Sequence, residues 1–208
     1  WNAHNSAADN YPFMVLTCYM LDKSKYNKEM ADMLRAERKL TSRLGSMPDE
    51  YSFSKHGFLR EETDTGKVIF GTSEYIKDGL IPLTEYIGIT PWSSRMIEML
   101  DDLSKYQRIA RKIEGYFYGN SVEEEINGNI LQTLSRVYWI TGDKKYLDWL
   151  IEIGDYYLLG NRNILKLDHL RLRDHGCELI SGLSELYVTL HYACPEKKKE
   201  YQKPLYEI

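Results

Sequence analysis

The sequence predicts an all-α protein built of antiparallel helix pairs. Apolar residues recur with the 3.6-residue helical period in eight segments. Very short links join the two helices in three of the pairs, and links that short force neighbouring helices to run antiparallel. The 208 residues, 43% hydrophobic and 28% charged, are typical of a globular protein. We expect one domain over residues 1–208.

The predicted helices follow one another in pairs. In chain order they span 12–21 with 27–44, 73–87 with 91–110, 129–141 with 144–159, and 175–193 with 195–208. Gly88 and Gly142 stand where a C-terminal cap is expected, and Pro91 and Pro195 at first helical positions. Pro82 should bend or interrupt its helix, because its ring removes a backbone donor. Short strands are expected at 67–70 and 114–118.

The two helices of each pair differ in composition. First helices are apolar around much of their circumference and contain small residues, whereas second helices are amphipathic with charged outer faces. This contrast predicts an inner and an outer layer. First helices recur at a loose period of roughly 50 to 65 residues, which an open superhelix and a closed toroid would share.

Charge and cysteine content exclude several classes of protein. The net charge is only −4 and no basic block is present, which argues against a nucleic-acid partner. No apolar run approaches the ~20 residues of a membrane span. Cys18, Cys177 and Cys194 lack zinc or disulfide spacing, so we expect buried thiols and no metal. Because Trp1 replaces a starting Met and the chain stops within a helical pattern, both ends are expected to be truncated and localisation stays open.

The loops that lead into first helices carry more functional side chains than those that lead into second helices. The latter contain mostly caps and lysines. The former supply acids, amides, arginines and histidines, and the candidates are His4, Asn5, Asp9, Asn10, Glu74, Asp78, Glu125, Asn127, Arg171, Arg173, Asp174 and His175. The contrast indicates a site at one end of the inner layer.

Structural roles compete with each functional interpretation. Asp9 or Asn10 could cap a helix, and Glu74 with Asp78, or the run 123–125, could lie on a solvated face. The sequence 127–129 is typical of a tight turn before a helix. Asp174 could also be a cap, but two arginines and a histidine surround it in the sequence, and a cap requires none of them.

The candidate residues suit cleavage of a glycosidic bond. That reaction uses two carboxyl groups, one to protonate the leaving oxygen and one to activate water or attack the sugar. We assign Asp174, Glu74 and Glu125 as catalytic candidates and the remaining candidates as substrate-binding residues. A forked guanidinium at Arg171 or Arg173 could bind a sugar carboxylate, which favours a glycan containing uronic acid.

Several segments together resemble the six-hairpin glycosidase-like superfamily, close to the bacterial β-glucuronidase-like proteins of glycoside hydrolase family 154. The resemblance rests on residues 5–13, 71–79, 127–128, 131–136 and 171–176. It implies an (α/α)6 toroid with its site at one mouth, an oligosaccharide or polysaccharide substrate with uronic acid, no obligatory cofactor, and a periplasmic or secreted location. Four hairpins are counted where the toroid has six, so we expect an incomplete barrel whose missing part could hold a catalytic carboxylate.

Two alternative functions remain open. A polysaccharide lyase on the same architecture would use His175 as a base and Arg173 to neutralise the uronate. A helical repeat could instead bind a protein partner without catalysis. Convergence of the candidate residues on one site would favour an enzyme. Oligomeric state is not indicated by any feature of the sequence.

Overall fold

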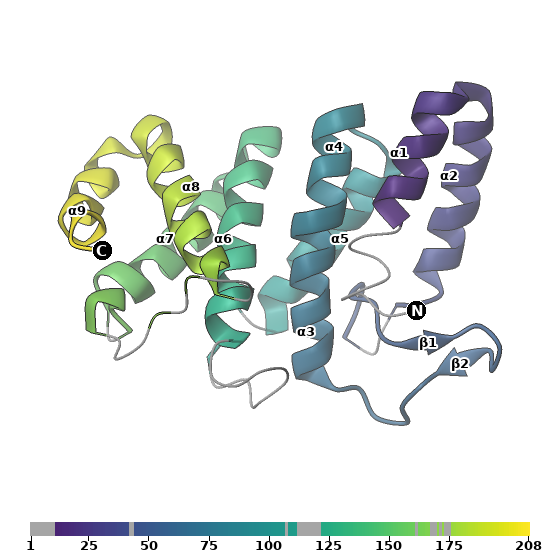
Figure 1. Cartoon of the computed structure of the whole chain (residues 1–208), viewed down its shortest axis with the longest axis horizontal. Helices are drawn as coiled ribbons and strands as arrows, with labels where there is room; N and C mark the ends of the chain where they lie inside the picture. The colour runs from purple at the N-terminus through teal and green to yellow at the C-terminus, as the bar shows by residue number, and fades with distance from the viewer. Residues whose placement is uncertain are drawn as a thin grey trace. The chain divides into compact units, whose positions relative to one another are not determined.

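The protein is all-α, as expected (Figure 1). The computed structural model describes residues 11–41, 44–106, 108–111, 122–160, 162–166, 170, 172 and 176–208. The chain forms two compact units, Trp1–Gln107 and Arg108–Ile208. Each unit is described by itself below. A single domain and a closed toroid both stay predictions.

The first unit contains two helix pairs and a small hairpin. Its elements are α1 (Tyr11–Leu21), α2 (Lys23–Arg38), β1 (Tyr51–Ser52), β2 (Gly57–Phe58), α3 (Thr65–Glu74), the π-helical turn η2 (Tyr75–Leu80), α4 (Ile81–Ile87) and α5 (Pro91–Tyr106). β1 and β2 pair antiparallel. Helix α1 packs on α2, and α4 packs on α5.

Local capping corrects two predicted helix boundaries. The Asp22 carboxylate accepts hydrogen bonds from the backbone N–H groups of Ser24 and Lys25, so α2 begins at Lys23 rather than at residue 27. Asp64 likewise accepts from the N–H of Lys67, and α3 begins at Thr65. The strand predicted at 67–70 is therefore wrong, because this β-branched run follows a helix cap. The second predicted strand, 114–118, lies outside the described residues.

Pro82 interrupts the regular α-helical pattern of the predicted 73–87 helix, as expected. The π-helical turn Tyr75–Leu80 comes just before it, and the N–H of Ile81 donates to the carbonyl of Ile76. The helical ribbon nevertheless continues from α3 through α4 (Figure 1). A π turn is a recognised way to accommodate a local change in the backbone hydrogen-bond ladder.

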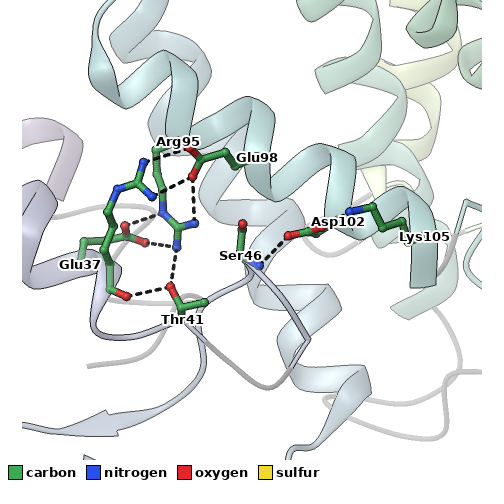
Figure 2. Close-up of polar contacts among 8 residues, drawn as sticks. Glu37, Thr41, Ser46, Arg95, Glu98, Asp102 and Lys105 are labelled. Carbon is green, nitrogen blue, oxygen red and sulfur yellow. Dashed lines mark hydrogen bonds and ion pairs between the residues drawn. The ribbon is translucent and has the colours of Figure 1, made fainter.

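A buried ion pair joins α2 to α5. Arg95 donates from Nε to Oε2 of Glu37 at 2.7 Å and from Nη2 to Oε1 at 3.1 Å. Nη2 also donates to Oγ1 of Thr41 at 3.4 Å, and Nη1 lies 3.7 Å from the partly exposed Glu98. Figure 2 shows the Arg95 guanidinium facing both carboxylates. Burial raises the pKa of Glu37 above its ordinary value, although the hydrogen bonds and charge of Arg95 oppose that rise.

A second contact attaches the loop after α2 to α5. The Asp102 carboxylate accepts from the backbone N–H of Ser46 at 2.7 Å and from Nζ of Lys105 at 2.5 Å (Figure 2). Gly45 adopts a φ of 75°, and a Cβ there would lie 2.6 Å from Oδ2 of Asp102. Glycine is therefore required at this position by both the backbone angle and the close approach.

The second unit contains two further helix pairs. Its elements are α6 (Val122–Thr141), α7 (Lys144–Leu158), the 3-10 turn η3 (Ile164–Lys166), α8 (Cys177–Ala193) and α9 (Pro195–Tyr206). The predicted links at 142–143 and at Cys194, and the link at 88–90 in the first unit, are confirmed. Gly88 and Gly142 both have positive φ, 80° and 68°, as a C-terminal glycine cap allows.

Helices α6 and α8 run parallel and pack closely on each other in the second unit. Contacts between them advance together along both chains: Gly128 lies against Glu178, Gly182 against Leu131, Arg136 against Glu185, and Trp139 against Thr189. The outer helices, α7 and α9, connect to them through the short links and keep charged outer faces. The inner and outer layers of a closed toroid stay predictions.

The three cysteines are not core residues. Cys18 and Cys194 are half-buried, Cys177 is exposed, and all three are free thiols. The expectation of buried thiols is wrong. The core instead consists of aliphatic and aromatic side chains, among them Trp92, Tyr75, Trp149, Tyr157 and Tyr201.

Candidate functional site

Three carboxylates occupy the first turn of α6. The helix begins at Val122, about two turns before the predicted start at residue 129, so Glu123, Glu124 and Glu125 lie within it. The expectation of a solvated acidic run followed by a tight turn is wrong, because Glu124 is 8% exposed and Glu125 only 4% exposed. The partial positive charge at a helix N-terminus favours carboxylates there.

Arg162 binds two of these carboxylates. Its Nη2 lies 3.2 Å from Oε2 of Glu123 and 3.1 Å from Oε1 of Glu124. Partial burial of Arg162 opposes its charge, but Glu124 and Glu123 together raise its pKa. The other carboxylate oxygen of Glu124, Oε2, is buried and has no hydrogen-bond partner among the described residues. The acidic turn is therefore only partly neutralised by this arginine.

Asn127 is used in packing. Its Oδ1 accepts from the N–H of Ala110 at 2.7 Å, and its Nδ2 donates to the Ala110 carbonyl at 3.0 Å and to the Tyr157 hydroxyl at 2.7 Å. The side chain is fully buried. Burial raises the pKa of Tyr157 far above its ordinary value. These bonds occupy the amide of Asn127 and fix the start of α6 to residue 110 and to α7.

The beginnings of α6 and α8 meet at Gly128. A Cβ at this position would overlap the backbone of Glu178 and Leu179, so glycine permits the close approach. Glu124 and Glu125 lie about one turn before this contact on α6. Oε2 of Glu178 is buried and lacks a hydrogen-bond partner in the described part of the chain. The sequence did not single out Glu178.

A polar face extends from Glu125 along α6. Spacing of i, i+4 and i+8 places Glu125, Asn129 and Thr133 on one side of the helix, and all three are buried. Oγ1 of Thr133 has no hydrogen-bond partner among the residues described. Buried polar atoms are normally hydrogen-bonded. We therefore expect the polar face of α6 to meet hydrogen-bonding groups of the protein or of a ligand.

Two candidates from the sequence lie in the first unit. Glu74 is the last residue of α3, and Asp78 lies in the π-helical turn that follows. Asp78 is exposed and its Oδ1 is 2.9 Å from Nζ of the adjacent Lys77. Single π turns are frequent at functional sites, although they also occur elsewhere. The proline four residues after Asp78 is the sequence signal that points to this irregular turn.

The other candidates fall outside the described residues. These are His4, Asn5, Asp9, Asn10, Arg171, Arg173, Asp174 and His175. Within the described residues, Glu125 follows Glu124 in the first turn of α6, and Arg162 binds Glu124; neither Glu124 nor Arg162 was a candidate from the sequence. Arg162 comes four residues after the end of α7, and no local sequence pattern links it to the acids of α6.

Comparisons with protein-family models, with curated proteins and with solved structures gave no match to this chain. Among the described helices, none is both long and apolar enough to cross a membrane.

Proposed function

We propose that this protein is a carbohydrate-active enzyme, a glycoside hydrolase that acts on uronic-acid-containing glycans through paired carboxyl groups. The observation that best supports this is the close approach of α6 and α8 at Gly128, with Glu178 at the contact and Glu124 and Glu125 about one turn before it. The proposal includes closure of the helix pairs into a toroid of the (α/α)6 type.

The setting of these carboxyl groups suits acid and base chemistry. A helix N-terminus favours the ionised form of a carboxyl group, whereas burial favours its neutral form. A site that combines both influences can hold one group as a base and another as an acid, as glycoside cleavage requires. Arg162 places a guanidinium beside these acids, where its Nη2 donates to one oxygen each of Glu123 and Glu124.

Glu125 and Asp174 are the proposed catalytic pair. Glu125 lies one turn before the Gly128 contact with α8, and Asp174 comes just before α8 in the sequence. Both therefore belong to segments that lead into the same pair of inner helices. Glu74 stays a catalytic candidate predicted from the sequence.

The test uses the full-length protein and a panel of uronate glycosides. Glu125→Gln and Asp174→Asn should each lower turnover by about 10²-fold or more, because each removes a proton-transfer group while keeping the side-chain shape. Glu123→Gln is the matched control: it changes a neighbouring acid of the same turn and should retain turnover. Thermal midpoints of all three variants separate lost catalysis from lost folding.

Different products distinguish the alternative functions. A product with a new carbon–carbon double bond, detected by its ultraviolet absorbance, would identify a lyase and overturn the hydrolase proposal. Full turnover by Asp174→Asn would leave that residue as a helix cap, since Asn caps a helix about as well as Asp. The absence of turnover on every uronate glycoside would instead favour the helical binding scaffold.

A further inference from the structure

An aromatic platform lies near the C-terminal ends of α6 and α8. Trp139 on α6 is 53% exposed and Tyr192 on α8 is 71% exposed, and their ring centroids are 6.0 Å apart with an interplanar angle of 75°. Val188, one turn before Tyr192 on the same helix, is also exposed. Because α6 rises 1.5 Å per residue, Trp139 lies roughly 20 Å along the helix from Glu125.

The orientation of the Trp139 ring is fixed. Its Nε1–H donates to Oγ1 of the buried Thr189 at 3.2 Å, and the edge-to-face contact with Tyr192 supports it from the side. A ring already held in one rotamer loses no further rotamer freedom when a ligand binds to its exposed part. Such preorganisation lowers the cost of binding.

Charged groups border the platform. Arg136, one turn before Trp139, donates from Nε and Nη2 to the Glu185 carboxylate at 3.1 and 2.9 Å, and both side chains are about one-third exposed. The exposed His191 adds a further polar group on α8. The apolar surface is therefore narrow and framed by hydrogen-bonding groups, unlike the broad apolar core of a protein interface.

We propose that Trp139 and Tyr192 form a second carbohydrate-binding site, which holds a pyranose chain by stacking. A pyranose ring has an apolar face of C–H bonds and a rim of hydroxyl groups. The exposed aromatic rings match that face, and the Arg136–Glu185 pair offers donors and acceptors to the hydroxyls. Only the choice of a carbohydrate as the ligand rests on the proposed function. It adds a surface that binds polymer far from the proposed site of cleavage.

The experiment measures binding of the full chain to polygalacturonate and to a neutral β-glucan by affinity electrophoresis. The unmodified protein should be retarded by at least one of the two polymers. The double variant Trp139→Ala/Tyr192→Ala should bind that polymer at least ~10-fold more weakly, the loss expected when aromatic stacking is removed. Tyr86→Ala, which removes an equally exposed ring from α4, is the matched control and should bind normally.

Two further measurements make the result decisive. Glu125→Gln should retain polymer binding, so the binding proposal can hold even if the proposed catalysis fails. Turnover of a small uronate glycoside should in turn be unchanged by the double substitution. The proposal is overturned if neither polymer retards the protein or if the double variant binds as tightly as the unmodified chain. It is also overturned if the double substitution changes only the sedimentation coefficient, because the rings would then mediate self-association.

Discussion

Arg95 and Glu37 form a two-point ion pair inside the first unit, with only 1% and 0% of their side chains exposed. The pair joins α2 to α5 across 58 residues of sequence. Removing two charges from water costs free energy. The two hydrogen bonds between Arg95 and Glu37 offset that cost only while both side chains are present. The contact therefore makes the packing of these helices sensitive to either residue.

Glu37→Gln should destabilise the first unit by about 3 kcal/mol or more, because it leaves the Arg95 charge buried without its partner. Denaturant titration of the full chain measures the free energy of unfolding. Asp32→Asn, which breaks the exposed ion pair with Arg35 on the same helix, should cost less than ~1 kcal/mol. The double change Glu37→Leu/Arg95→Met should recover much of the loss. Equal effects of Glu37→Gln and Asp32→Asn would contradict the structural role given to the buried pair.

Gly128→Ala should separate the first turns of α6 and α8. The added methyl group would overlap backbone atoms of Glu178, which cannot rotate away, so a loss of about 3 kcal/mol in unfolding free energy is expected. Gly154→Ala is the comparison, since its methyl group would meet side-chain atoms of Leu186 and Tyr201 that can move slightly. Its loss should be smaller, about 1 kcal/mol. Calorimetry that ranked Gly154→Ala as the more damaging change would refute the close approach of α6 and α8.

Tyr157→Phe should weaken the second unit by about 1 to 3 kcal/mol at neutral pH, because Nδ2 of Asn127 loses a buried acceptor. The substitution should also alter the response to alkali. Burial raises the pKa of Tyr157, so its contribution to stability is complete below the ordinary tyrosine pKa of about 10 and decreases as pH rises above that value.

Unfolding free energies measured from pH 8 to pH 11 test this second expectation. The decline above pH ~10 should be shallower in Tyr157→Phe than in the unmodified protein. Burial and the neighbouring Asp155 raise the pKa of Tyr201 as well, so Tyr157→Phe should remove only part of the decline. Tyr206→Phe, at an exposed position, should leave the curve unchanged. An unaltered slope in Tyr157→Phe would show that its hydroxyl does not remain neutral in the folded state.

The interactions at the helix ends are mostly local, which explains why the sequence predicted the helix pairs well. Gly88 and Gly142 adopt the positive φ values expected of helix-ending glycines, and Pro91 and Pro195 begin the following helices. These residues act through their own backbone preferences. Their effect can therefore be predicted without knowing what packs against them.

The candidate site was predicted less completely, since its contacts join residues that are far apart in the sequence. Glu125 was identified from its place beside an inner helix, but the roles of Arg162 and Glu178 come from packing. The sequence of α6 contains Asn127-Gly128, which is typical of a turn, and tertiary contacts overrode that preference. Asn127 is held by residue 110 and Tyr157, while Gly128 permits the approach of α8.

The sequence by itself determined the all-α class and the pairing of helices, because periodic apolar residues and short links act locally. Tertiary structure alone decided that α6 starts at Val122 and that Glu37 meets Arg95. Each of these outcomes depends on the free energy of burying side chains against distant partners. That energy can outweigh the small intrinsic preferences of single residues for helix, strand or turn.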